Sequence, residues 1–125
     1  MRGILLDSVI LIDHFNGIQS ATEFIADNFN QCAISAITYA EVLTGFEQDG
    51  HALQAAITLL DQFDFLVLDK QIAIETAKQR KLTRLKLPDA TQLAFAVSHS
   101  LQLATRNTKD FTTEKFAFVI VPYQL

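Results

Sequence analysis

The chain has 125 residues, of which 50% are hydrophobic and 19% charged, and its formal net charge is −4. This length fits one domain over residues 1–125, and this composition excludes a disordered chain. No apolar run approaches the roughly 20 residues that cross a bilayer, so we expect a soluble protein with no membrane partner. Cys32 is the single cysteine and has no partner for an internal disulfide, which is consistent with a cytoplasmic location.

The charges divide unevenly between the two halves of the chain. Up to Asp69 there are ten acids, and the only base is Arg2; from Lys70 onward there are nine bases and four acids. One interpretation is two solvated faces. The other is a local basic surface for a polyanion, which does not require a basic protein overall.

The apolar pattern predicts short strands that alternate with helices. In chain order, we expect strands over residues 3–7, 32–35, 65–68, 102–105 and 116–121. We expect helices over residues 8–15, 22–29, 36–46, 51–63, 70–85 and 88–101. Ser35 is expected to cap the third helix, Phe63 and Phe65 are expected in the core, and the fifth helix is expected to bury Ile72, Ala73, Ala77 and Leu82.

This alternation predicts an α/β domain with a mainly parallel five-stranded sheet and helices on both faces. In such sheets ligands bind beyond the carboxyl ends of the strands. Four acids fall near such ends or on the helices that follow: Asp7, Glu41, Asp89 and Asp110.

Three of these acids have an ordinary structural explanation when each is taken alone. Asp7 ends the first strand and could simply cap the next helix. Asp89 follows Pro88, and proline with an acid in the first turn is a common helix start. Asp110 lies in a polar loop with Asn107, and either residue could serve as a neutral or charged ligand or as a turn contact.

Glu41 resists a structural explanation because its helix is apolar on nearly every side, which predicts burial. A buried carboxylate needs a cation, hydrogen bonds or a raised pKa. Arg106 could be a structural partner, but we favour a functional role. If the four acids converge, their repulsion calls for a hard cation such as Mg²⁺ or Mn²⁺, and the absence of a His or Cys set argues against structural zinc.

Four short motifs in this order resemble the PIN-domain family and, within it, the VapC-type toxins of bacterial toxin–antitoxin pairs. The motifs are LLDS at 5–8, SAITYAEV at 35–42, PDA at 88–90 followed by LAFA at 93–96, and TRNTKDF at 105–111. The resemblance covers essentially the whole chain. It implies a three-layer α/β/α fold and a metal-dependent endoribonuclease that hydrolyses single-stranded RNA or tRNA.

The resemblance also implies roles for individual residues. Asp7, Glu41 and Asp89 take the places of the metal-binding acids, and Asp110 or Asn107 takes the fourth place. Ser8, Asn107 and Thr105 would support the site. Gln92 departs from the apolar residue more usual at its position, which puts the packing or partner contacts of its helix in question. The candidates for holding RNA are Arg80, Arg84, Arg106 and Lys109.

The resemblance further implies a small cognate antitoxin that inhibits the protein, and a homodimer. The competing function is a catalytically silent PIN-like module that binds RNA or protein without cutting. Intact acids at the main positions argue against that alternative. A haloacid-dehalogenase-type phosphatase would need a second Asp two residues after Asp7, and that position holds Val9.

Overall fold

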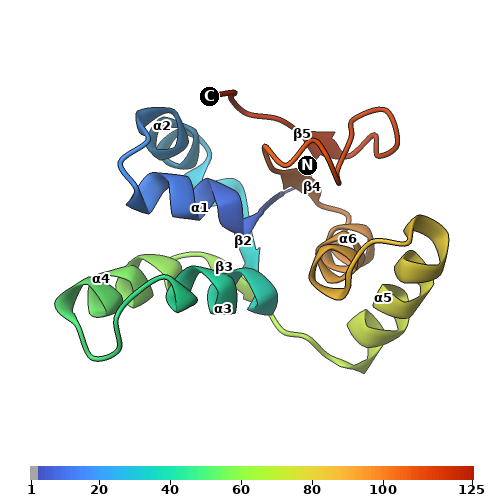
Figure 1. Cartoon of the computed structure of the whole chain (residues 1–125), viewed down its shortest axis with the longest axis horizontal. Coiled ribbons are helices and arrows are strands. Elements are labelled where there is room, and N and C mark those ends of the chain that lie inside the picture. The colour runs from blue at the N-terminus through green and yellow to red at the C-terminus, as the bar shows by residue number, and fades with distance from the viewer. Residues whose placement is uncertain (1–2) are drawn as a thin grey trace.

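The computed structural model describes residues 3–125; Met1 and Arg2 lie outside the described residues. Five strands form one sheet in the order β3-β2-β1-β4-β5, and every pairing is parallel (Figure 1). The strands are β1 (Ile4–Leu6), β2 (Cys32–Ser35), β3 (Asp64–Leu66), β4 (Gln102–Ala104) and β5 (Val119–Ile120). The predicted parallel sheet is therefore confirmed.

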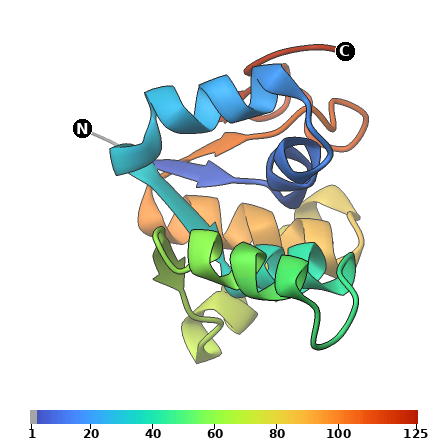
Figure 2. The same ribbon diagram turned by 90° about the vertical axis from the view of Figure 1, so that its left-hand side faces the viewer.

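Helices cover both faces of the sheet (Figures 1 and 2). They are α1 (Ser8–Phe15), α2 (Gln19–Asp27), α3 (Ala36–Thr44), α4 (His51–Leu60), α5 (Lys70–Thr83) and α6 (Leu87–His99), with a 3₁₀ turn, η1 (Phe29–Gln31). Within residues 3–125, no helix is long and apolar enough to span a membrane.

Alternation along β1 divides the core into two layers. Ile4 and Leu6 pack with residues of α1 to α4, whereas Leu5 points to the other face and packs with Phe95 of α6 and Ile72 of α5. Because both faces of β1 and β2 are covered, all their residues are buried. The fold is thus the three-layer α/β/α arrangement that the sequence predicted.

Polar side chains at the carboxyl ends of the strands start the helices that follow. The Asp7 carboxylate accepts a hydrogen bond from the Ser8 N–H and caps α1, and the Ser35 hydroxyl accepts from the Thr38 N–H and caps α3. Asp69 caps α5 in the same way, through the Ile72 N–H. These caps fix the directions in which the helices leave the sheet.

Two details of the predicted core are wrong. Phe63 is buried as expected, but Phe65 is 48% exposed, because β3 is an edge strand with less cover. Helix α5 buries Ile72 and Thr76, whereas Leu82 is 71% exposed and the two predicted alanines are also exposed. The segment from β3 to the start of α6 therefore presents apolar side chains to solvent.

Candidate active site

The candidate site lies where the chain changes direction across the sheet. From β1 the chain moves outward to β2 and β3, then returns to add β4 on the other side of β1. The carboxyl ends of β1 and β4 flank this switch point, the place where ligands bind in open parallel sheets. Asp7 follows β1 and Thr105 follows β4, and the Asp7 N–H donates to the Ala104 carbonyl oxygen at 2.9 Å.

The Asp7 carboxylate is held by three donors from three parts of the chain. Its Oδ1 accepts from the Ser8 N–H at 2.9 Å and from Gln92 Nε2 at 3.2 Å, and its Oδ2 accepts from the Thr105 hydroxyl at 2.7 Å. Asp7 is only 7% exposed. The Thr105 hydroxyl and the Ser8 backbone N–H therefore hold the Asp7 carboxylate in place.

A polar cleft of about 450 Å³ opens beside Asp7. Its lining holds three of the four candidate acids together with the loop that follows β4: Asp7, Ser8, Val9, Glu41, Asp89, Arg106, Asn107, Thr108 and Lys109. A larger depression, of about 690 Å³, lies beside the start of β4, but none of the candidate acids lines it. The cleft beside Asp7 is the candidate site because of its polar lining and the acids that converge on it, and not because of its volume.

Glu41 lines this cleft, but the predicted burial of its carboxylate is wrong. Helix α3 buries only Thr38 and Val42, and Glu41 is exposed to solvent. Its carboxylate therefore needs no compensating partner, and Arg106 pairs elsewhere. Glu41 remains a site candidate because of its place on the cleft wall.

Asp89 is the acid whose ionisation is affected by the other three candidate acids. Partial burial raises the pKa of Asp89, and the negative charges of Asp110, Asp7 and Glu41 raise it further, while Lys86 opposes them. The carboxylates are thus close enough to destabilise one another's ionised forms. A cation in the cleft would relieve this repulsion.

Asn107 and Asp110 share the loop after β4 and hold each other. The Asn107 Nδ2 donates to Asp110 Oδ2 at 3.2 Å, and the Asp110 N–H donates to Asn107 Oδ1 at 3.4 Å. The Asn107 N–H also donates to the Thr105 hydroxyl oxygen at 3.0 Å. Asn107 lines the cleft and Asp110 does not, so Asp110 contributes its charge and the orientation of the loop.

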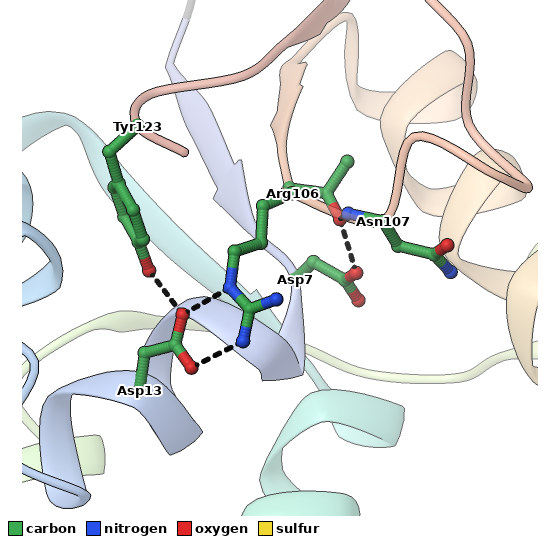
Figure 3. Close-up of polar contacts among 6 residues, drawn as sticks. Asp7, Asp13, Arg106, Asn107 and Tyr123 are labelled. Atoms are coloured by element: carbon green, nitrogen blue, oxygen red, sulfur yellow. Dashed lines mark hydrogen bonds and ion pairs between the residues drawn. The ribbon is translucent and has the colours of Figure 1, made fainter. Parts of the chain in front are cut away.

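Arg106 is anchored by an ion pair that the sequence analysis did not anticipate. Its Nε and Nη2 donate to the two oxygens of Asp13 at 2.6 and 2.8 Å, and the Tyr123 hydroxyl donates to Asp13 Oδ2 at 2.8 Å (Figure 3). The hydrogen bonds from Arg106 hold the pKa of Asp13 below its ordinary value, although burial acts the other way. These three hydrogen bonds to Asp13 connect α1 with the loop after β4 and with the C-terminal segment.

The four predicted RNA contacts fall in two places. Lys109 and Arg106 line the acidic cleft. Arg80 and Arg84 lie with Lys81 around a separate depression of about 540 Å³ on α5. Leu87 lines that depression and Asp89 lines the cleft, so the first turn of α6 contributes one side chain to each.

Gln92 is the site residue whose role the sequence analysis missed. It is 1% exposed on α6 and donates to Asp7. A signal was present, because an amide beside four consecutive apolar residues, LAFA at 93–96, needs a buried partner. Nothing in a single sequence names that partner.

The donors that line the cleft are carboxylate and amide oxygens, which suit Mg²⁺ or Mn²⁺ and not zinc. Within residues 3–125, no three Asp, Glu, His or Cys side chains stand together in a group that could hold a metal ion. Mg²⁺ commonly binds through one or two carboxylates and keeps several waters. The donor chemistry of the cleft lining is therefore compatible with a hydrated divalent ion.

A family model described as "PIN domain" matches residues 4–114. The chain therefore belongs to the PIN-domain family, and the resemblance drawn from the four motifs is confirmed. The comparison with curated proteins returned no match.

Solved structures of toxin–antitoxin complexes contain similar chains. A chain of a toxin–antitoxin complex from Klebsiella pneumoniae is 38% identical, with 98% of this chain and 100% of that chain covered and a TM-score of 0.89. A chain of FitAcB from Neisseria gonorrhoeae is 24% identical, with 98% and 99% covered and a TM-score of 0.80. A chain of VapBC2 from Rickettsia felis, bound to a DNA fragment from their promoter, is 18% identical, with 94% and 95% covered and a TM-score of 0.70; these last two likenesses show the fold.

Proposed function

We propose that this chain is the toxin of a toxin–antitoxin pair, and that it is an endoribonuclease that uses Mg²⁺ or Mn²⁺ to hydrolyse single-stranded RNA or tRNA. The observation that carries the proposal is the convergence of Asp7, Glu41 and Asp89 on one polar cleft at the switch point of a PIN-type sheet. The similarity to a chain of the Klebsiella complex supports the toxin assignment.

In this proposal the cleft residues divide the work. Asp7, Glu41 and Asp89 hold the metal, Asn107 adds a neutral oxygen, and Asp110 keeps Asn107 in place. When bound, a divalent ion supplies positive charge beside the phosphate and makes water a stronger acid. Hydrolysis breaks one P–O bond: the water oxygen adds to phosphorus and its proton passes to the leaving oxygen. Lys109 is an exposed residue of the cleft lining, and its charge attracts the RNA backbone.

RNA cleavage with added Mg²⁺ or Mn²⁺ tests the proposal. Wild type should cut, while Asp7→Asn and Glu41→Gln should lose most of the activity, because each removes one negative charge from the cleft. Asp64→Asn is the matched control, because Asp64 is an exposed acid on β3 away from the cleft lining. Equal cleavage by all four proteins would reject the proposal.

A catalytically silent binding module is the second candidate function. It is favoured by one observation, that no three acids of the described residues form a metal-holding group as they stand. A thermal-shift titration separates the two candidates: stabilisation by Mn²⁺ that disappears in Asp7→Asn supports the nuclease, and no stabilisation at any Mn²⁺ concentration supports the module.

The proposal includes two protein partners and a cytoplasmic location, where cellular RNA is accessible. A co-encoded antitoxin should bind the acidic cleft through a basic side chain and stop cleavage. A homodimer is supported by the exposed apolar side chains of the segment from β3 to the start of α6. Within residues 3–125, six of the nine large exposed hydrophobic side chains lie there: Phe65, Val67, Leu68, Ile74, Leu82 and Leu87.

A further inference from the structure

Gln92 stands out as a buried amide in an apolar helix. It is 1% exposed, and its helical neighbours Leu93 and Phe95 are fully buried. An amide removed from water without hydrogen bonds is strongly unfavourable, so its partners explain why it is tolerated there. We infer that Gln92 is a positioning residue: it fixes the Asp7 carboxylate and joins it to the first turn of α3 without adding charge to the acidic cleft. The part of this inference that concerns metal and RNA rests on the proposed function.

The hydrogen bonds of Gln92 account for both ends of its amide. Its Nε2 donates to Asp7 Oδ1 at 3.2 Å and to the Thr38 hydroxyl at 2.8 Å. Its Oε1 accepts from the Ser35 hydroxyl at 2.6 Å. No buried side-chain polar atom of the described residues is left without a partner, so the whole network is satisfied.

The orientation of the amide follows from its surroundings. The Ser35 hydroxyl oxygen lies 2.6 Å from Gln92 Oε1 and 3.4 Å from Thr38 Oγ1, so Oε1 is the better acceptor for its proton. The Thr38 hydroxyl donates to the Leu6 carbonyl oxygen at 3.2 Å, so its oxygen is available to accept from Gln92 Nε2 at 2.8 Å. A flipped amide would set Oε1 against the Asp7 carboxylate, two acceptors facing each other. Nε2 therefore points at Asp7.

This arrangement determines which oxygen of Asp7 is available to a ligand. Oδ1 accepts two hydrogen bonds, from Ser8 and Gln92, whereas Oδ2 accepts one, from Thr105. A carboxylate oxygen accepts about two hydrogen bonds. The hydrogen bond from Gln92 thus occupies the second acceptor position of Oδ1, and the acceptor position that remains free on Asp7 is on Oδ2.

Gln92 also connects the three elements that carry the cleft acids. Asp7 lies at the junction of β1 and α1, and Thr38 precedes Glu41 by three residues on α3, which places both on one side of that helix. Asp89 precedes Gln92 by three residues on α6. A neutral donor is the suitable residue here, because a carboxylate would add a further negative charge beside Asp7, Glu41 and Asp89.

A double-mutant cycle on the metal-free protein tests the positioning role directly. Gln92→Met, Asp7→Asn and the double variant are compared by urea unfolding. If Gln92 donates to Asp7, the change in the unfolding equilibrium constant of the double variant should differ from the product of the two single changes by about fivefold or more. Changes that multiply independently would overturn the inference.

If Gln92→Met fails to fold, Gln92→Glu takes its place in the same double-mutant cycle. An ionised Glu at this position repels Asp7, and Asp7→Asn should then rescue it, because the new amide donates to the new carboxylate. The matched control is Thr91→Val, the neighbouring buried residue of α6, whose hydroxyl donates to the Leu87 carbonyl oxygen and not to an acid. Thr91→Val should show no coupling to Asp7→Asn.

Metal and RNA measurements then extend the result. Mn²⁺ binding by calorimetry should weaken about 10-fold in Gln92→Met and stay unchanged in Thr91→Val. At saturating Mn²⁺, kcat should fall while KM for RNA changes little, because Gln92 touches an acid and not the substrate. Coupling in the cycle without Mn²⁺ binding or cleavage by wild type would reject the proposed function and leave the positioning role standing. If Gln92→Met binds Mn²⁺ as tightly as wild type, Gln92 does not position Asp7 for metal binding, and that part of the inference is overturned.

Discussion

Asp13→Asn is the substitution that most directly tests how Arg106 anchors the loop after β4. Asp13 is 4% exposed and accepts three hydrogen bonds, two from Arg106 and one from the Tyr123 hydroxyl. Asparagine keeps the shape of the side chain but turns one acceptor oxygen into a donor that faces another donor. It also removes the charge that pairs with the guanidinium.

The expected loss is about 2 kcal/mol of unfolding free energy. A hydrogen bond to a charged group contributes about 1.5–3 kcal/mol, and breaking a fully buried pair costs about 3–5 kcal/mol. The Arg106 side chain is 34% exposed, so water partly replaces its lost partner and the smaller range applies. For a chain of this size, such a loss lowers Tm by about 6–10 °C.

The assay is thermal unfolding near pH 7 and again at acid pH. Arg106 lowers the pKa of Asp13 from its ordinary 3.8, so the folded protein favours the ionised carboxylate. This stabilisation is complete above the ordinary pKa and is lost as the pH falls through the lower folded-state value. The difference in Tm between wild type and Asp13→Asn should therefore shrink at strongly acid pH.

The control for this experiment is Asp61→Asn. Asp61 accepts a hydrogen bond from the Tyr39 hydroxyl at 3.0 Å on the exposed surface, so its loss should change Tm by about 2 °C or less. An Asp13→Asn protein with wild-type Tm, or a difference that persists unchanged at acid pH, would refute the anchoring role.

Four further predictions concern other parts of the molecule. Burial raises the pKa of Cys32 to about 11, so a thiol reagent at about pH 8 should leave the native protein unmodified and label it in denaturant. Burial and hydrogen bonding also raise the pKa of Tyr123 from 10.0, so the stability advantage of wild type over Tyr123→Phe should decline as the pH rises above that value. Replacing both Arg80 and Arg84 by Ala should reduce the slope of log binding constant against log salt concentration for single-stranded RNA by about 1.4. An unchanged slope would show that these two arginines do not contact the RNA. Ile74 is 65% exposed on α5, so Ile74→Glu should shift the mass measured by light scattering from dimer to monomer; an unchanged mass would place the dimer contact elsewhere.

The sequence was sufficient to predict the parallel sheet and to bring Asp7 and Thr105 to the same edge of it. The apolar run that ends at Asp7 and the one that ends before Thr105 predicted strands, and the rule for parallel sheets put both residues at one edge. The structure confirms this through the hydrogen bond between Asp7 and Thr105. Local patterning determines such features because strands and caps depend on neighbouring residues.

The errors share a different cause, which is contact between distant segments. The apolar residues around Glu41 predicted burial, but α3 packs on one side only and leaves that carboxylate in solvent. Arg106 binds Asp13, 93 residues away, and Gln92 binds Asp7, 85 residues away. One sequence shows that such polar groups need partners, but it does not say which of several candidates the fold brings near.

The long separation within the site has a consequence for how the protein is synthesised and folded. The hydrogen bond between Thr105 and Asp7 closes a span of 98 residues, and closing so long a loop costs about 4 kcal/mol of chain entropy. The β1–β2 pair uses residues from the first third of the chain, whereas the β1–β4 pair has to wait for residues 102–104. A growing chain can therefore form part of the sheet before it holds every residue of the candidate site. The proposed cleavage of RNA therefore cannot begin until Thr105, 98 residues after Asp7, has been synthesised and β4 has paired with β1.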